Sequence, residues 1–358
     1  MDRSKLHLGR RHLLRLGALV LAAFLLACGG RQPTSSRVTP VFSLPRPTLS
    51  PGPSGRLTSA STSPTPVPPQ AGATKVLAKA GITLLYVPAG EFLMGSTDAA
   101  VDEALALCQH YQSNCDRSWF TAEQPQHCVY VDGYWIGQTE VTNAQYRSFI
   151  EAGGYADHEH WTEEGWQWKE RNHVVQPQYW NEEPWSGADY PVVGMSWYEA
   201  AAFAAWAGAC LPTEAEWEKA ARGSDGWLWP WGDAWDGRSA NFCDANCDYD
   251  WKDGAVDDGY QYTSPAGNYR SGASPYGALD CAGNVWEWVA DWYGEGYSPT
   301  GVVSRNPGGI GSGTHHVLRG GSWNFAPYAQ RCTTRARLEP QNRSSALGFR
   351  VVVPDLGL

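Results

Sequence analysis

Near the end of the chain, two apolar segments enclose a stretch without a regular period. The apolar segments cover residues 317–323 and 347–353 and have the composition of core strands. Between them, residues 324–346 follow neither the period of a strand nor that of a helix, which is typical of a surface loop held by buried strands. The paired glycines at positions 320 and 321 allow tight turns where this segment begins, because they carry no Cβ.

Regular elements are predicted over much of the preceding chain. The patterns over residues 82–87 and 90–95 predict a β-hairpin, and residues 128–136 predict a second pair of strands. A helix is expected over residues 98–111. Further helices begin with capping boxes, in which a hydroxyl caps the first turn and a Glu or Gln reaches back. The boxes are Thr142 with Gln145, Ser196 with Glu199 and Thr213 with Glu216, and Gly153, Gly208 and Gly223 are expected to end these helices.

The composition favours a folded domain rich in turns. The 358 residues are 42% hydrophobic and 18% charged, a balance that supports a large core. The 19 Trp, 39 Gly and 24 Pro residues indicate a fold with little regular secondary structure, held together by indole packing. The formal net charge of −10 argues against nucleic acid and anionic lipid surfaces as partners.

Residues 1–28 have the composition of an export signal. Basic residues precede an apolar segment over residues 16–27 that is short for a membrane span. This segment ends in Leu-Leu-Ala-Cys28, which resembles the bacterial lipoprotein box and implies cleavage before Cys28 and acylation of its thiol. An uncleaved anchor helix is the alternative. We therefore expect a lipid-anchored protein of the cell envelope, facing outside the cytoplasm.

A segment rich in Pro, Ser, Thr and Gly follows over residues 29–75. It cannot bury enough apolar surface to offset its ordering entropy, so we predict a disordered linker. The folded part is then predicted to be one domain over residues 76–354.

Two motifs at the ends of the irregular stretch resemble those of a known family. Residues 319–323 read Arg-Gly-Gly-Ser-Trp and residues 348–350 read Gly-Phe-Arg. Both are similar to elements of the formylglycine-generating (sulfatase-modifying factor) family. The resemblance implies an α+β protein with the formylglycine-generating-enzyme type of C-type lectin fold, and an active site between the two motifs.

The content of that segment decides whether the family's chemistry is expected. The oxidase members bind copper(I) through two cysteines and convert a substrate cysteine to formylglycine with dioxygen. Counted from Ser322, the corresponding positions are Phe325 and Gln330. Neither supplies the soft thiolate that copper(I) prefers, and Cys332 is alone and out of register. We therefore expect no copper and a non-catalytic domain; a divergent oxidase, or another family enzyme acting on protein substrates, is the alternative.

Two segments rich in oxygen ligands predict calcium sites. Calcium takes about six to eight hard oxygens, which backbone carbonyls supply as well as carboxylates do. The resemblance to the family implies one ion in each segment. The alternative is a tight turn whose polar groups are satisfied by hydrogen bonds. The first predicted site is Asn241, Phe242, Asp258 and Tyr260, and the second is Asp280, Gly283, Val285 and Glu287.

The cysteine count predicts disulfides. Apart from Cys28, eight cysteines remain, and an even number in an exported chain favours pairing. Cys108 with Cys115, and Cys243 with Cys247, are the expected pairs because they are close in sequence. A zinc site is the alternative, although no Cys-x-x-Cys or nearby His pair supports it. The sequence does not connect Cys128, Cys210, Cys281 and Cys332.

With the copper ligands replaced, the 324–346 segment is interpreted as a binding surface. Aromatic, Arg and small polar residues held by rigid strands suit recognition of a protein or a small-molecule ligand. The arrangement also resembles the variable proteins of diversity-generating retroelements, in which positions before a Gly-Phe-Arg strand are altered together. A purely structural envelope protein is a third possibility. The predicted ligand-binding residues are Trp323, Asn324, Phe325, Tyr328, Gln330, Arg331, Arg335 and Arg337.

Overall fold

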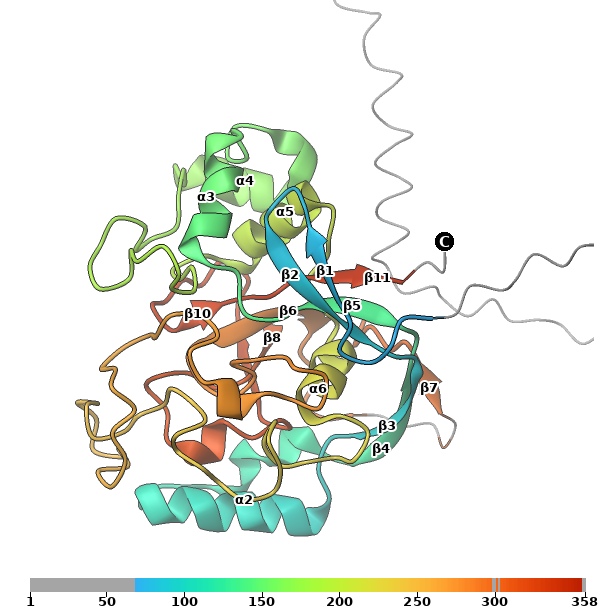
Figure 1. The fold of residues 1–358 in the computed structure, drawn as a ribbon, viewed down its shortest axis with the longest axis vertical. Coiled ribbons are helices and arrows are strands. Elements are labelled where there is room, and N and C mark those ends of the chain that lie inside the picture. The colour runs from blue at the N-terminus through green and yellow to red at the C-terminus, as the bar shows by residue number, and fades with distance from the viewer. Residues whose placement is uncertain (1–67, 298–300, 302, 356–358) are drawn as a thin grey trace, which may run out of the picture. The chain divides into compact units, whose positions relative to one another are not determined.

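The computed structural model describes residues 68–297, 301 and 303–355, and the predicted export signal, Cys28 and nearly all of the predicted linker lie outside these ranges. One sheet joins strands from both ends of the described chain (Figure 1). Each strand is antiparallel to its neighbours, and the central two are almost completely buried. The order is β1 (Thr74–Leu77), β2 (Ile82–Val87), β5 (Tyr134–Gly137) and β11 (Val352–Pro354).

A second four-stranded sheet contains both sequence motifs. The Arg-Gly-Gly-Ser-Trp motif begins at the last residue of β8. The Gly-Phe-Arg motif begins at the last residue of β10, which pairs with β6 in parallel. The order is β10 (Leu347–Gly348), β6 (Trp286–Trp292), β8 (His316–Arg319) and β9 (Arg335–Leu338). A third sheet has the order β3 (Gly90–Met94), β4 (His127–Val131) and β7 (Ser304–Arg305).

The predicted strands are present, but the predicted pairings are wrong. β2 and β3 do not form a hairpin, since β2 pairs with β1 and β5 while β3 pairs with β4. β4 and β5 likewise belong to different sheets. At the junction between β2 and β3, the buried ammonium of Lys219 donates to the carbonyl oxygens of Pro88 (2.8 Å) and Gly90 (2.9 Å). An apolar alternation shows that a strand is buried and does not show which neighbour it pairs with.

The helices begin and end close to where the sequence predicts. The helix predicted over residues 98–111 is α2, and all three capping boxes form at α3, α5 and α6. Gly208 ends α5 with a φ of 76°, where the absence of a Cβ avoids strain. α3, α4 and α5 lie together, and α2 lies at the other end of the domain (Figure 1). The bounds are α2 (Asp98–Tyr111), α3 (Asn143–Glu151), α4 (Glu163–Arg171), α5 (Trp197–Ala207) and α6 (Glu214–Arg222).

Across the described ranges, no helix combines the length and the apolar character needed to cross a membrane. The core instead packs aromatic side chains between the sheets and the helices. Tyr146 on α3 stacks on Phe203 of α5 at 5.2 Å, and Phe349 of the Gly-Phe-Arg motif packs edge-on against Phe203 at 5.4 Å. The motif therefore fastens the second sheet to the helices. These packed indole and phenyl rings agree with the predicted α+β fold held together by aromatic contacts.

A buried histidine on β8 is held between two indoles. The ring of His316 stacks on Trp197 at 3.9 Å and on Trp292 at 3.8 Å, and its Nδ1–H group donates to the carbonyl oxygen of Asp291 at 3.1 Å. Its Nε2 atom is buried without a partner among the described residues. Burial therefore lowers the pKa of His316 to about 4, although the backbone hydrogen bond acts in the opposite direction.

We expect this histidine to make the fold sensitive to acid. Because the folded-state pKa lies below the ordinary value of 6.5, the neutral ring stabilises the fold above pH 6.5, and this stabilisation is lost as the pH falls through about 4. The difference corresponds to about 3 kcal/mol. Urea unfolding between these pH values should show a smaller loss in His316→Phe than in the wild type. Equal losses in both proteins would contradict the assignment.

Candidate functional site

The 324–346 segment is a folded wall, and the prediction of a surface loop is wrong for most of it. A turn at Gly320 and Gly321, whose φ angles are 96° and 75°, leads into this wall. A Cβ on Gly321 would lie 2.0 Å from the side-chain oxygen of Gln330, so this turn requires glycine. A 3-10 turn, η5 (Pro327–Ala329), and strand β9 follow. Residues 326–335 are all buried, which explains why one-sided periodicity is missing from the sequence.

The outer side of this wall lines a cavity of about 560 Å³, which we call the aromatic cavity. Its volume is within the usual range for a small-molecule site, about 300–1,000 Å³. The other sides come from β8, from the start of β6 and from segments near residues 112–120 and 251. The aromatic lining residues are Trp119, Phe120, Trp251, Trp286, Phe325 and Tyr328, and Arg335 and Arg337 contribute positive charge.

The structure brings most of the predicted ligand-binding residues to this cavity. Gln112 donates from its amide to the hydroxyl of Tyr328 at 3.1 Å, which fixes the tyrosine at the cavity edge. The indole of Trp251 donates to the carbonyl oxygen of Asn324 at 3.0 Å. No pattern in the sequence marks Gln112, Trp119 or Trp251 as cavity residues, because they reach the cavity from distant segments. The predicted residues that line the cavity are Asn324, Phe325, Tyr328, Arg335 and Arg337.

The other predicted binding residues lie behind the wall and hold it in place. The indole of Trp323 donates to the carbonyl oxygen of Ser345 at 3.3 Å. Arg331, which is 1% exposed, makes a bidentate ion pair with buried Glu123, at 2.6 and 2.9 Å. Burial alone would raise the pKa of Glu123, but the guanidinium lowers it below its ordinary value. These contacts leave Trp323, Gln330 and Arg331 outside the lining of the aromatic cavity, where they support its wall.

The two positions that correspond to copper ligands in the family's oxidases lie next to each other. The buried amide of Gln330 donates to the carbonyl oxygens of Phe325 (3.0 Å) and Ser322 (3.1 Å), while the Phe325 ring faces the cavity and packs edge-on against Trp286. An aromatic ring and a neutral amide do not fit copper(I), which prefers thiolates. The nearby thiol of Cys332 is fully buried, and burial raises its pKa to about 12, so it stays protonated.

Arg335 reaches the cavity with its charge already neutralised. Its guanidinium pairs with buried Glu214 at 2.6 and 2.9 Å and also donates to the carbonyl oxygen of Ala122. Arg337 is different, because its side chain is 44% exposed and forms a solvent-exposed ion pair with Glu295. An exposed pair of this kind contributes little stability, so Arg337 is able to exchange its partner for a ligand.

The second predicted calcium segment forms a tight loop around buried carboxylates. Asp280 has a positive φ of 55° and accepts from the amide of Gly267. Glu140, which the sequence did not point to, lies beside Asp280. Burial, together with the Asp280 and Glu287 carboxylates, raises the pKa of Glu140 well above its ordinary range. Its Oε2 atom is buried without a donor among the described residues. Adjacent buried carboxylates with an unpartnered oxygen fit a bound cation.

Glu287 belongs to this second segment and forms an ion pair with a residue from outside it. The guanidinium of Arg350 pairs with both of its oxygens at 2.6 Å, and the indole of Trp217 donates to it at 2.9 Å. Part of its charge is therefore already compensated. Among the described residues no group of three or more His, Cys, Asp and Glu side chains is arranged as a metal site. Calcium at this segment would accordingly need the carbonyl oxygens predicted at Gly283 and Val285.

The first predicted calcium segment lies directly against the second. The amide of Asn284 donates to the carbonyl oxygen of Asn241 at 2.8 Å, and a Cβ on Gly283 would lie 2.0 Å from the same oxygen. The side-chain oxygen of Asn241 is buried without a partner in the part of the chain that the structure describes. Burial raises the pKa of Asp258 to about 7, although the amides of Tyr260 and Phe242 donate to it. The unpartnered side-chain oxygen of Asn241 and the carboxylate of Asp258, which accepts from the neighbouring Phe242 amide, are both ligand types that calcium takes.

We predict that calcium stabilises the domain at these two segments. A chelator should lower the melting temperature, because a ligand at about 100 times its Kd stabilises the native state by about 3 kcal/mol. Asp280→Ala should remove most of this response. Asp225→Ala, a change at an exposed carboxylate elsewhere, should keep it. A melting temperature that chelation leaves unchanged in the wild type would contradict the calcium assignment.

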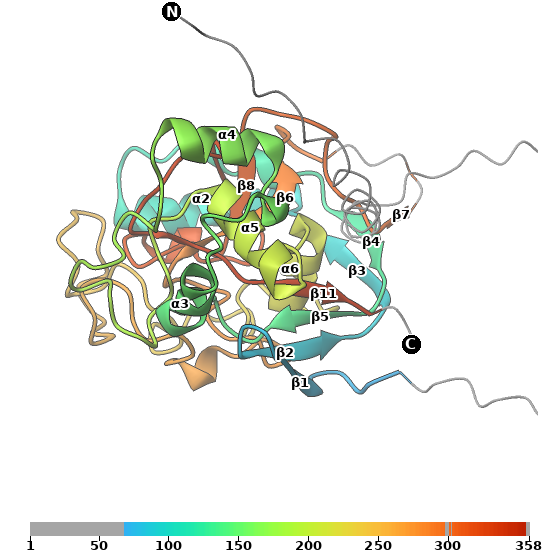
Figure 2. The same ribbon diagram turned by 90° about the horizontal axis from the view of Figure 1, so that it is seen from above.

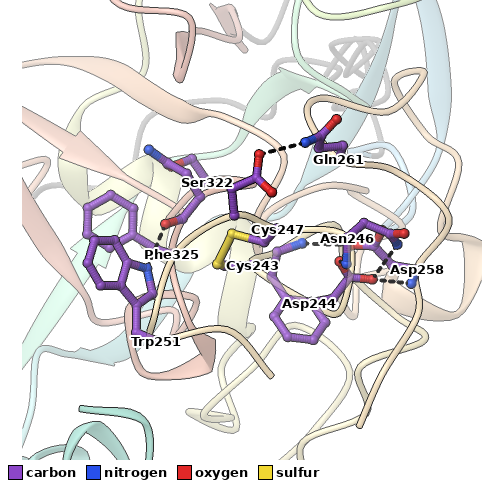
Figure 3. The surroundings of a disulfide bond; sticks show 12 residues. Cys243, Asp244, Asn246, Cys247, Trp251, Asp258, Gln261, Ser322 and Phe325 are labelled. Carbon is purple, nitrogen blue, oxygen red and sulfur yellow. Dashed lines mark hydrogen bonds between the residues drawn. A yellow bond between two sulfur atoms is a disulfide. The ribbon is translucent and has the colours of Figure 1, made fainter. Parts of the chain in front are cut away.

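Both predicted disulfides are present within the described residues. Cys108–Cys115 closes the end of α2, and Cys243–Cys247 lies between Trp251 and Phe325 of the cavity lining on one side and Asp258 of the first predicted calcium segment on the other (Figure 3). The amide of Cys243 donates to the carbonyl oxygen of Phe325 at 3.0 Å, so this bridge supports the cavity wall. Cys128, Cys281 and Cys332 have free thiols.

The comparisons with known proteins agree with this geometry. Residues 72–354 match the family described as the sulfatase-modifying factor enzyme 1-like domain, and the chain belongs to that family. Hercynine oxygenase of Mycolicibacterium smegmatis is 34% identical over 75% of this chain and 60% of that protein. The formylglycine-generating enzyme of Streptomyces coelicolor is 32% identical over 74% of this chain and 87% of that protein.

The chain spans only 52–60% of the length of the hercynine oxygenases that it matches. Among solved structures, variable protein 1 of Treponema denticola superposes with a TM-score of 0.54 and 22% identity, covering 78% of this chain and 98% of that one. At that identity the likeness concerns the fold alone. The predicted formylglycine-generating-enzyme type of fold is confirmed.

Proposed function

We propose that the protein is a lipid-anchored, extracytoplasmic binding module whose aromatic cavity holds a ligand without redox chemistry. The observation that supports this is the fate of the two copper positions. Phe325 lines the cavity, whereas Gln330 ties the wall to the carbonyls of Ser322 and Phe325. The place where the family's oxidases hold copper is an apolar wall here. Acyl chains on Cys28, detected by mass spectrometry, would establish the proposed anchor.

The lining of the cavity suggests the chemistry of the ligand. Rings from several segments offer flat apolar surface, and a flat apolar ligand would bury the most surface against them. Arg337, packed on the Tyr293 ring at 4.6 Å, supplies an exchangeable positive charge at the edge. A ligand with an aromatic body and one acidic group therefore fits best, either as a small molecule or as part of a protein.

We predict that anilinonaphthalene sulfonate, a flat aromatic sulfonate, binds the folded full-length protein in this cavity. Arg337→Gln should weaken binding by about tenfold, which corresponds to about 1.4 kcal/mol for the lost charge-assisted contact. Fluorescence titration at a temperature well below melting measures this affinity. Phe325→Ala should weaken binding further, because it removes apolar contact area.

Arg305→Gln is the matched control for this experiment. Arg305 also lies over a tyrosine ring, that of Tyr130 at 3.8 Å, and pairs with the exposed carboxylate of Asp132, but it is not part of the cavity lining. Its substitution should leave the affinity for the probe unchanged. Equal losses in the Arg305 and Arg337 variants, or no saturable binding by the wild type, would contradict the proposal.

Diversification by a retroelement is a more specific version of the same proposal. It is supported by the arrangement of the wall, in which some positions, such as Asn324 and Arg337, line the cavity while others, such as Gln330 and Arg331, are buried outside its lining. A reverse-transcriptase gene and a near-copy of the coding segment for residues 319–350 beside this gene would be the required genetic signature. Their absence from the neighbourhood would reject diversification while leaving the binding proposal untouched.

A further inference from the structure

A second depression, which we call the α4 groove, lies outside the family's site. It has a volume of about 530 Å³ and is bounded by α4, the start of α5 and Gln341 near the end of the 324–346 segment. α4 lies beside α5, with which it is in contact (Figure 2). None of the residues that line this groove lines the aromatic cavity. The groove is therefore available for a separate role.

Two aromatic rings form the apolar surface of the groove. The rings of Trp168 on α4 and Tyr198 on α5 lie 5.6 Å apart with a 38° tilt, and both are half-buried. Gly165 allows this arrangement, because a Cβ there would lie 3.0 Å from the Tyr198 side chain. The helices thus hold the two rings beside each other with one side open to the groove.

Charged groups of both signs surround these rings. Glu164, Trp168 and Arg171 are spaced by four and three residues, which places them on one face of α4. Among the described residues, neither Glu164 nor Arg171 makes a side-chain hydrogen bond or an ion pair. Both act on the hydroxyl of Tyr198: burial and Glu164 raise its pKa, while Arg171 lowers it. An unpaired carboxylate and an unpaired guanidinium therefore line the groove together with Tyr198.

This combination discriminates between classes of ligand. Glu164 repels an anion and Arg171 repels a cation, whereas a neutral hydroxyl-rich ligand forms charge-assisted hydrogen bonds with both. The amides of Asn172 and Gln341 add groups that donate and accept, as neighbouring hydroxyls require. The C–H face of a sugar ring carries slight positive charge and packs well on the electron-rich face of an aromatic ring.

We propose that the α4 groove binds a neutral oligosaccharide, with a pyranose ring resting on Trp168 and Tyr198 and its hydroxyls bound between Glu164 and Arg171. The proposal does not depend on the function of the aromatic cavity. It assigns the protein a second ligand class at a second site, so one molecule would be able to hold a glycan and a cavity ligand together.

Isothermal titration of the full-length protein with cellohexaose, chitohexaose, xylohexaose and maltohexaose tests this proposal. At least one of these neutral hexasaccharides should bind saturably. Trp168→Ala should abolish binding, and Arg171→Gln should weaken it by about tenfold. Because Trp168 also packs against the core, the exposed positions Arg171 and Gln341 provide variants that keep the fold. Gln341→Ala should weaken binding in the same direction as Arg171→Gln.

Controls separate this site from the aromatic cavity. Arg238→Gln changes an exposed arginine outside the groove and should leave sugar binding unchanged. Arg337→Gln should lower the affinity for anilinonaphthalene sulfonate without changing sugar binding. The proposal is overturned if no hexasaccharide binds, or if binding survives both Arg171→Gln and Gln341→Ala. Sugar binding that is lost in Phe325→Ala and retained in the α4 variants would place the sugar in the cavity and also overturn it.

Discussion

Arg331→Met should destabilise the domain by about 3–5 kcal/mol, the usual cost of leaving one buried charge without its partner. Glu123 is 1% exposed, and after the substitution the hydroxyls of Ser96 and Thr333 would be the only described groups that donate to its side chain. Denaturant unfolding measures the change as a lower transition midpoint. A loss of this size would show that Arg331 supports the cavity wall, whereas the sequence suggested a ligand contact.

Arg337→Met is the matched control, because it removes an arginine of the same segment from an exposed pair. Exposed ion pairs contribute about 0–1 kcal/mol to stability, so the denaturant midpoint of this variant should be close to that of the wild type. Adding Glu123→Gln to Arg331→Met should recover part of the lost stability, because the buried position then carries no charge. If Arg331→Met and Arg337→Met were equally stable, the structural role of Arg331 would be wrong.

The second large effect concerns copper. We expect the wild type not to bind copper(I), whereas Phe325→Cys combined with Gln330→Cys should bind a single ion tightly, because two adjacent thiolates suit this soft metal. The two backbones already meet through the Gln330 amide, which donates to the Phe325 carbonyl oxygen at 3.0 Å. Competition with the chromogenic chelator bathocuproine disulfonate measures the affinity.

The wild-type protein, supplied with copper, dioxygen and a sulfatase-type peptide, should form no formylglycine. The single variants Phe325→Cys and Gln330→Cys should not compete with the chelator, since one thiolate gives a weak site. The divergent-oxidase alternative makes the opposite prediction. Peptide oxidation by the wild type that is lost in Cys332→Ser would make this protein an oxidase with a displaced thiolate, and would reject the binding-module proposal.

The sequence predicted best where structure is decided by neighbouring residues. Each capping box joins residues three positions apart, as in Ser196 and Glu199, and such contacts form from local geometry. The disulfides Cys108–Cys115 and Cys243–Cys247 are also short-range and were predicted correctly. The two motifs gave the family because they lie in the sheet that carries the site.

The errors concern contacts between distant residues. Glu123 and Arg331 are separated by 208 positions, and no local pattern marks such a pair. An arginine in an aperiodic, polar stretch suggests exposure, so the sequence placed Arg331 at the surface. Glu140 was missed for the same reason, because it joins the second predicted calcium segment from a distant part of the chain. The strand pairings failed because an apolar alternation identifies a buried strand without naming its partner.

The cavity wall has a consequence for how this protein could change over evolutionary time. Its positions divide into anchors, such as Gln330 and Arg331, whose side chains are committed to the interior, and facing positions, such as Asn324 and Arg337, which line the cavity. A facing residue that is also exposed, such as Arg337, can be exchanged at little cost to folding, whereas exchange of an anchor removes the support of the whole wall. New specificities would therefore arise on an unchanged frame, and a library confined to facing positions should yield folded proteins with altered ligands.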